Sequence, residues 1–505
     1  MLVREASPAI SLSRRRAITA GLLLGMTLGA LEATVVSTAM PTVIATLGGL
    51  AHYSWVFSAY LLTSTASVPI WGRLSDLYGR RRMYLAGIAV FLVGSALSGA
   101  AGSMVQLIVF RAIQGLGAGA VIPLSLTIIG ELYKLQERAR AQALFSALWG
   151  LSSIAGPLAG GYITDALTWR WVFYLNLPFG LLALAVIALA YPAAPPKHGV
   201  RVDWPGAALL FASVTTLLVG LSDATAAVVP WLIATLVLLV AFVLVERRTA
   251  EPILPIDLLG NSLIVRSLVV AFIVGTVMFG AIAFVPLFVQ GVMGGSATEA
   301  GQILTPLFLG WVTTSVITAR LTVRVGYRRI VIAGVSLLTI SFGILAMVTE
   351  HTQRTTLLGA VLMLGCGLGL AMLALLLAVQ HGVERSQLGI ATSLNQFARS
   401  VGSAVGVALM GALLARGLQG ALPEGLPGMT AGMIKLEGLA RERFAGALAQ
   451  VFTAATAMSA VALVASFFLP PVNFSHGVPQ GAGEAMLAAE MSNLEPDDEP
   501  IAVSD

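Results

Sequence analysis

Charged residues and cysteine are both scarce in this chain of 505 residues. Only 10% of the residues are charged and 57% are hydrophobic, whereas a soluble domain carries about 25% charged residues. This composition excludes an ordinary soluble protein and favours a membrane protein. The single cysteine, Cys366, excludes a disulfide within the chain and a cysteine-rich metal site.

Signatures of catalysis are also missing. The sequence has no His-Glu-x-x-His motif and no glycine-rich phosphate loop ending in Lys-Ser/Thr, and its five histidines are scattered. We therefore expect neither an enzyme nor an ATP-driven pump, and no cofactor or metal. The net charge of +5 is interpreted as lysine and arginine in loops beside a bilayer rather than as nucleic-acid binding.

Long apolar runs fill most of the chain. Because a helix needs about 20 apolar residues to cross the hydrocarbon, we expect an all-α integral membrane protein with fourteen transmembrane helices. The first run is too long for a cleaved signal peptide. The fourteen runs are 17–40, 54–71, 83–102, 104–131, 141–165, 171–191, 205–222, 228–246, 264–290, 298–321, 329–349, 355–380, 388–416 and 446–470.

Lysine and arginine are distributed unevenly among the loops. With the N-terminus in the cytoplasm, 21 basic residues lie inside and 6 outside, while Arg111 and Arg399 fall within runs. The positive-inside rule thus predicts a multi-pass protein of the cytoplasmic membrane with both termini cytoplasmic.

A basic loop occurs twice. Gly72–Met83 is matched 247 residues later by Arg320–Arg329, with Gly79 aligned on Gly326. The copies lie eight runs apart instead of six, which predicts two homologous six-helix bundles with an inserted pair of helices that faces lipid. The predicted divisions are an N-terminal segment 1–16, bundles 17–191 and 264–470, a hairpin 205–246 and a disordered acidic tail 471–505.

Two opposite charges interrupt apolar runs at a similar depth. Glu32 and Arg111 each lie roughly 11–12 Å below the outer surface at a rise of 1.5 Å per residue, so they can pair if their helices adjoin. One interpretation is a carboxylate that binds and releases a proton as its surroundings change. The alternatives are a static ion pair between helices and direct binding of a cationic substrate.

The first basic loop holds an acidic residue, Asp76, that a plain positive-inside loop does not explain. We expect Asp76 to contact the positive end of a helix in the other bundle in one conformation only, forming a latch. Glycines allow the tight turn, and Glu131 lies where it can reach the arginines. The latch residues are Gly72, Asp76, Gly79, Arg80, Arg81 and Glu131.

Run 141–165 contains a proline among glycines. Gly156, Pro157, Gly160 and Gly161 predict a kinked helix that packs closely and seals or opens a central path, although generic helix packing is the alternative. Other polar or aromatic residues are candidates for a substrate cavity, with packing or lipid contact as the alternative. They are Tyr60, Gln114, Trp149, Asn176, Phe279, Gln290 and Asn395.

Together these motifs resemble the major facilitator superfamily. Gly72–Met83 is similar to its loop signature, Arg111–Gly117 to its fourth-span signature and Gly156–Gly161 to its antiporter signature. Leu31–Pro41 and Trp169–Pro178 resemble segments of its fourteen-span drug:proton antiporter branch, and so does Pro286–Gln290.

The resemblance implies proton-driven export of small lipophilic or cationic molecules. It further implies that Arg111 assists proton coupling and that the Asp76 loop controls the conformational switch. Three positions depart from the family pattern. Glu32 replaces the usual aspartate and Ser152 replaces a glycine. In the second copy of the basic loop, Val323 occupies the position that corresponds to Asp76 in the first copy.

The leading hypothesis is a multidrug exporter that works as a monomer and takes protons and a small molecule as its partners. A dedicated exporter of one metabolite, lipid or antibiotic is the alternative within the carriers, since fold does not name a substrate. A membrane-embedded enzyme and a non-transporting sensor or scaffold are competing classes.

Overall fold

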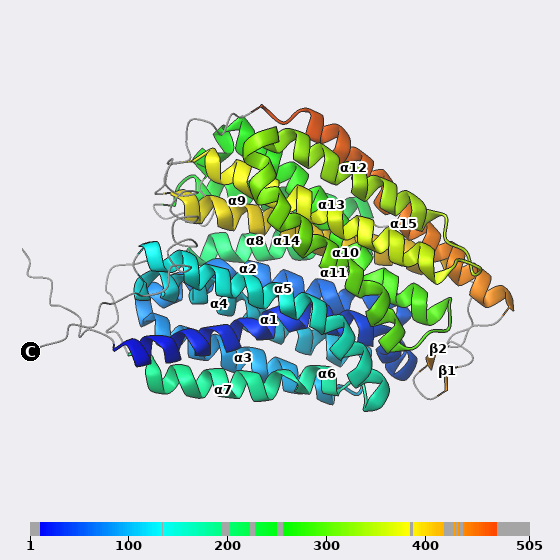
Figure 1. The fold of residues 1–505 in the computed structure, drawn as a ribbon, viewed down its shortest axis with the longest axis horizontal. Coiled ribbons are helices and arrows are strands. Elements are labelled where there is room, and N and C mark those ends of the chain that lie inside the picture. Colours follow the sequence, from blue (N-terminus) through cyan, green and yellow to red (C-terminus); the bar gives the residue numbers. More distant parts are fainter. Residues whose placement is uncertain are drawn as a thin grey trace, which may run out of the picture.

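The computed structural model describes residues 11–133, 135–192, 203–222, 228–249, 256–383, 387–418, 429–430, 433–434 and 438–471. Nearly all of this part is helical, and the long helices run roughly along the longest axis of the molecule (Figure 1). The predicted tail beyond Pro471 and the segment 419–428 lie outside the described residues.

The helices form two groups with a pair between them in sequence. The first group consists of α1 (Leu12–Leu47), α2 (Tyr53–Tyr78), α3 (Arg80–Ala100), α4 (Met104–Leu132), α5 (Leu135–Ala166), α6 (Trp171–Tyr174) and α7 (Asn176–Ala190). The pair is α8 (Trp204–Ser222) and α9 (Val228–Glu246). The second group consists of α10 (Ser262–Gly291), α11 (Ala297–Val325), α12 (Tyr327–Ala346), α13 (Arg354–His381), α14 (Leu388–Gly417) and α15 (Gly438–Phe467).

Short elements complete the fold. The 3-10 turns η1 (Leu50–His52) and η2 (Ile256–Gly260) precede α2 and α10, respectively. Strands β1 (Met429–Thr430) and β2 (Met433–Ile434) pair antiparallel, with Met429 opposite Ile434.

Each of the fourteen predicted runs falls on one of these helices, but the number of spans is supported only in part. Eleven described segments are long and apolar enough to cross a membrane, with α6 and α7 counted as one, and the bent α1 would be the twelfth. Helices α2 (26 residues) and α5 (32 residues) are long enough but more polar.

Several predicted boundaries were wrong. We expected the first helix to end before Pro41, but α1 continues to Leu47 with the proline inside it, as membrane helices permit when neighbours satisfy the backbone. The predicted run 171–191, by contrast, agrees with one candidate span, Trp171–Ala190, in which the single turn residue Leu175 separates α6 from α7. The last helix, α15, begins at Gly438 rather than at residue 446, because Leu439–Phe444 extends the helix beyond the apolar run.

The largest apolar core among the described residues joins the two groups near one end of the molecule. We call the end that carries Arg80–Arg82 and Arg328 the basic end. Near the opposite end, Met40 and Tyr53 of the first group lie in one buried cluster with Phe288 of the second. Toward the basic end, the first group has a core of its own from α1, α3, α4 and α7, and a smaller cluster joins η2, α10, α13 and α14.

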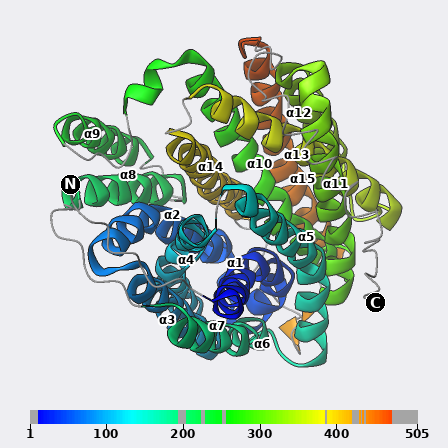
Figure 2. The ribbon, with the colours of Figure 1, turned by 60° about the vertical axis from the view of Figure 1, so that its left-hand side comes forward.

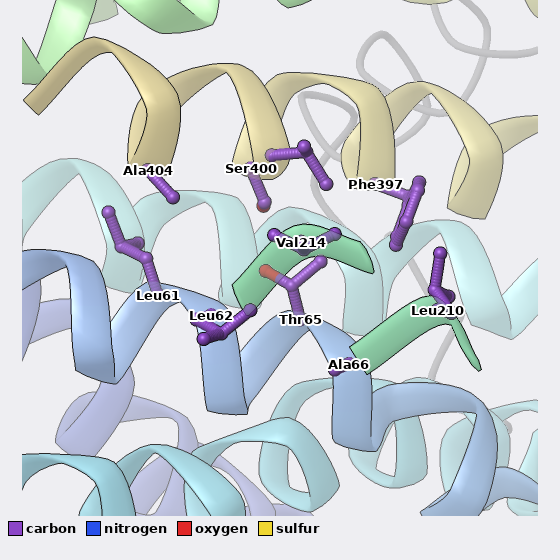
Figure 3. A pocket seen from close by; sticks show the side chains of 10 residues that line it. Leu61, Leu62, Thr65, Ala66, Leu210, Val214, Phe397, Ser400 and Ala404 are labelled. Atoms are coloured by element: carbon purple, nitrogen blue, oxygen red, sulfur yellow. The ribbon is translucent and has the colours of Figure 1, made fainter. Parts of the chain in front are cut away.

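Helices α8 and α9 pack against each other beside the seam between the groups (Figure 2). Leu210 and Val214 of α8 lie beside Leu62 of α2 and Ala404 of α14, around a small apolar crevice (Figure 3). The expected hairpin that faces lipid fits α9, which is mostly exposed, whereas one side of α8 packs against α2 and α14. Periodicity alone predicted apolar helices but not the seam that α8 fills.

Candidate functional site: a buried ion pair and the seal beside it

Glu32 and Arg111 form a salt bridge between α1 and α4. Their side chains are 1% and 2% exposed, respectively. Glycines of α4 allow this placement: a methyl group at Gly117 would lie 2.2 Å from the backbone nitrogen of Phe91 in α3, and one at Gly115 would lie 2.5 Å from a carbonyl of α2. Helix α4 is thereby held close to α2 and α3 while its polar face meets α1.

A network of amides and a hydroxyl surrounds the pair. Gln114 Nε2 donates to Glu32 Oε2 at 2.9 Å, and Asn176 Nδ2 donates to the same oxygen at 2.8 Å. Arg111 also donates to Gln114 Oε1 at 2.7 Å. Ser95 accepts from both Gln114 and Asn176, at 3.2 and 3.0 Å. Every partner of the Glu32 carboxylate is therefore a donor, which suits a charged acceptor.

Aromatic rings enclose the arginine. The guanidinium carbon of Arg111 lies 4.2 Å from the ring centroid of Tyr60 and 5.8 Å from that of Phe173. Arg111 Nε donates to the carbonyl of Val56 at 3.2 Å. A cation over an aromatic face gains electrostatic attraction, most of all where water is excluded.

This buried pair is a poor way to gain stability. Removing two charges from water is costly, and a well-packed apolar pair of similar volume is often as stable. The arrangement instead holds one titratable carboxylate in a fixed place, within reach of a fixed cation. Chemically, it is suited to a proton that binds when the pair separates and leaves when the pair forms.

The glycines of α5 serve two different contacts. A methyl group at Gly156 would lie 1.9 Å from Thr34 Oγ1, and one at Gly160 would lie 2.6 Å from the carbonyl of Val35, so both face α1. Gly161 faces the other group, where a methyl group would lie 2.4 Å from the carbonyl of Ala297 in α11.

The second α5 contact is reciprocal. A methyl group at Gly301 of α11 would lie 2.1 Å from the carbonyl of Pro157. Helices α5 and α11 thus meet backbone to backbone near the end opposite the basic end. The motif Gly156–Gly161 links the helix that carries Glu32 to the other group of helices.

Asp165, in the last turn of α5, binds the start of α11. Its carboxylate accepts the backbone N–H of Ala297 at 3.1 Å and that of Thr298 at 2.8 Å. These are orphan donors at the positive end of a helix. The role of Asp165 could not be predicted, because nothing in the sequence pairs residue 165 with residue 297.

Gln290 closes the contact between α1 and α10. Its Nε2 donates to the carbonyl of Thr38 at 2.8 Å, and its Oε1 accepts from Thr42 at 3.2 Å. Tyr53 of α2 donates to the carbonyl of Ala283 in α10. We call Gln290, Gly161, Asp165 and these partners the seal, because they join the two groups near the end opposite the basic end.

The first basic loop contacts its own group of helices. Asp76 pairs with Arg80 at 2.5 Å, and Arg80 also pairs with Glu131 at 3.2 Å. Arg81 donates to the carbonyl of Ala188. Within the described part of the chain, no hydrogen bond or ion pair joins Asp76 to the second group in this conformation, whereas Glu131 does reach an arginine of the loop.

The duplicated loops share one backbone geometry. Gly79 has φ 92° and ψ 141°, and Gly326 has φ 86° and ψ 143°. Both residues join consecutive helices at a positive φ that favours glycine. The sequence repeat is therefore also a structural repeat. Gly72 does not share this geometry: a methyl group there would meet nothing within 4 Å, so no close approach requires a glycine at that position.

The predicted cavity residues do not share one cavity among the described residues. Tyr60, Gln114 and Asn176 belong to the ion-pair network, and Gln290 belongs to the seal. Phe279 packs with apolar side chains at the α2–α14 seam. Asn395 is 7% exposed in α14, and the side chain of Trp149 lies outside the described residues.

Comparison with known proteins identifies the family. Residues 22–407 match the model of the Major Facilitator Superfamily. The chain is 38% identical to multidrug transporter protein MdtP of Bacillus subtilis over 409 residues, which cover 80% of this chain and 76% of that protein. It is 36% identical to multidrug resistance protein 3 of the same organism over 419 residues, which cover 82% of each.

Solved structures show the same fold at low identity. A bacterial homologue of the human lysosomal transporter Spinster, in an inward-facing and unoccupied conformation, aligns with a TM-score of 0.67 at 16% identity, covering 91% of this chain and 97% of that one. The chain is a member of the Major Facilitator Superfamily and falls in its multidrug efflux branch.

Proposed function

We propose that the protein is a proton-coupled antiporter that exports small lipophilic or cationic compounds across the cytoplasmic membrane. The observation that carries the proposal is the buried Glu32–Arg111 pair, set in a network of donors. The chain's place in a family branch that includes multidrug transporters supports efflux.

In this proposal the chain crosses the membrane fourteen times. The more polar helices α2 and α5 cross as well, because helices of both groups cover them: α2 packs against α4 and α14, and α5 packs against α1 and α11. Residues 17–191 and 264–470 form the two bundles, and 205–246 form the inserted hairpin. Both termini are cytoplasmic, so that the basic end faces inward, and the protein works as a monomer.

The described conformation is then inward-facing. The seal closes the outer end, where Asp165 and Gln290 join the groups. Alternating access requires that these contacts break while others form at the basic end. Asp76, now paired with Arg80, is free to exchange partners in the outward-facing state.

The coupling step follows from the pair. In the outward-facing state, separation of Glu32 from Arg111 lets the carboxylate take a proton from outside. The return to the inward-facing state brings Arg111 back, and the proton leaves toward the cytoplasm. One proton thus enters in each cycle that carries a substrate out, and Glu32 is the only group whose protonation has to change in this scheme.

Transport in proteoliposomes tests the proposal. With an acidic lumen and the basic end outside, wild type should accumulate ethidium on enclosed DNA, and Glu32→Gln should abolish this flux. Glu442→Gln, the same change at an exposed site of α15, should leave it intact. Flux that ignores the proton gradient in wild type, or that persists in Glu32→Gln, would rule out the coupling.

A further inference from the structure

Arg399 is a cation inside a predicted span, and no acidic residue in the described part of the chain pairs with it. It lies eleven residues after the start of α14 and eighteen before its end. At 1.5 Å per residue it is about 16 Å from one end and about 27 Å from the other. Both distances exceed the reach of an arginine side chain, so its guanidinium does not reach either end of the helix.

The contacts of Arg399 are weak for a cation at this depth. Its guanidinium donates to Gln396 Oε1 and lies 3.5 Å from Met372 Sδ of α13. Its backbone faces α10, where a methyl group at Gly275 would lie 2.3 Å from the Arg399 carbonyl. The side chain therefore extends from α14 toward α13 and is only half-buried.

A second unsatisfied donor lies one turn away. Asn395 is four residues earlier, on the same face of α14. Its side chain is more than nine-tenths buried, and its Nδ2 has no hydrogen-bond partner among the described residues. A buried amide without a partner is costly. Asn395 and Arg399 together offer donors that the rest of the described chain leaves unused.

The buried acid Glu32 is not available as a counter-ion for Arg399. Its carboxylate is already bound by Arg111, Gln114 and Asn176. We propose that Arg399 and Asn395 bind the carboxylate of an amphipathic organic acid, which is a substrate of the transporter. This inference rests on the transport activity proposed above and adds acids to its substrates.

The chemistry of the two donors fits that ligand. A guanidinium presents a planar fork of donors that matches the two oxygens of a carboxylate. Gln396 holds the fork in place through its acceptor oxygen, and the Asn395 amide can bind a remaining lone pair. Met372 borders the guanidinium with a flexible thioether that adapts to apolar bodies of different shape.

Equilibrium binding tests this site without a proton gradient. The protein in phosphatidylcholine nanodiscs is titrated against fluorescein at pH 8, where the probe is anionic, and binding is followed by fluorescence polarisation. Wild type should bind, and Arg399→Gln should weaken binding on the order of tenfold, the loss of a charge-assisted hydrogen bond. Arg399→Lys should retain part of the affinity, and Asn395→Ala should lose several-fold.

A control variant and a pair of competitors separate charge from fold. Arg416→Gln makes the same change at an exposed site in the last turn of α14 and should bind as wild type. On wild type, 1-naphthylacetate should displace fluorescein, whereas its neutral amide, 1-naphthylacetamide, should not. The competitors need no variant, so a misfolded Arg399→Gln does not decide the outcome.

Three results would overturn the inference. They are no fluorescein binding by wild type, equal displacement by the acid and the amide, and displacement by phosphatidylglycerol in the nanodiscs, which would assign the site to a lipid phosphate. Failure of gradient-driven ethidium flux would instead reject the proposed coupling, and it would leave this binding result unchanged.

Discussion

The Oδ2 atom of Asp165 lies 2.8 Å from the backbone nitrogen of Thr298, so a side chain at the end of α5 caps a helix of the other group. We had expected such a contact from Asp76 at the basic end, whereas here it is made at the opposite end. An acidic residue facing a helix start thus holds this conformation closed where the seal lies.

Loss of the Asp165 cap should shift the protein away from the described conformation. Asp165→Ala removes a helix cap, which is worth about 1 kcal/mol, a change of roughly fivefold in the ratio of two states. The measurement uses spin labels in place of Tyr78 and Val325, both exposed near the basic end, in a Cys366→Ser background. The distance between the labels is expected to be shorter in the outward-facing state, in which the basic end closes, and Asp165→Ala should increase the population with that shorter distance. Asp165→Asn, which keeps one acceptor oxygen, should give a smaller shift. Equal distance distributions in the Cys366→Ser parent, Asp165→Ala and Asp165→Asn would argue against the cap.

Removal of one ionic partner should destabilise the protein more than removal of both. Arg111→Gln leaves the Glu32 carboxylate buried without its cation, at a cost of about 3–5 kcal/mol. The double change Glu32→Gln/Arg111→Gln should recover much of the thermal stability measured in detergent but none of the proton-driven flux. Recovery of both would mean that the pair is a static link between α1 and α4.

A side chain at Gly161 should prevent the seal from closing. The Cβ of Gly161→Val would lie 2.4 Å from the carbonyl of Ala297, closer than real contacts allow, so α5 and α11 must separate. We expect loss of transport and more of the outward-facing state in the same spin-label measurement. Gly343→Val is the matched control, since a methyl group there meets nothing within 4 Å, and normal flux in Gly161→Val would refute the tight contact.

Asp76→Asn should favour the described conformation. Here the Asp76–Arg80 pair is partly exposed, with side chains 32% and 20% accessible, and its loss should cost less than 1 kcal/mol. The predicted latch of the other conformation would lose its charge entirely. Transport should therefore slow while the spin-label distance at the basic end lengthens, and an unchanged distance would remove Asp76 from the switch.

Near the basic end, Tyr191 supports the Glu131–Arg80 pair. Its hydroxyl donates to Glu131 Oε2 at 3.1 Å, and burial, followed by the neighbouring Glu131, raises the pKa of Tyr191 above its ordinary value. Because the folded pKa is the higher one, this contribution is present below the ordinary tyrosine pKa and declines as pH rises through the raised value. Tyr191→Phe should therefore remove a pH-dependent loss of thermal stability in alkaline buffer.

The sequence predicted the helices better than their contacts. Apolar length located all fourteen runs, and matched depth predicted that Glu32 and Arg111 could pair. Asn176 was predicted as a cavity residue, not as a partner of Glu32. The two residues are 144 positions apart, and a single sequence carries no signal that they approach each other. Ser95 was missed for the same reason, since serines are common in membrane helices and only the fold brings this one to Gln114 and Asn176.

Local chemistry also misled where tertiary packing decides. The first predicted run ended at Met40, yet α1 continues through Pro41 to Leu47. The apolar pattern of α8 predicted a helix that faces lipid and gave no sign of its contact with α2 and α14, because lipid and a neighbouring apolar helix favour the same side chains.

The position of α8 has a consequence for how compounds reach the protein's centre. Leu210 and Val214 of α8 pack beside the seam between α2 and α14 and line the small apolar crevice there. Helix α8 therefore restricts lateral access between α2 and α14 from the surroundings of the molecule.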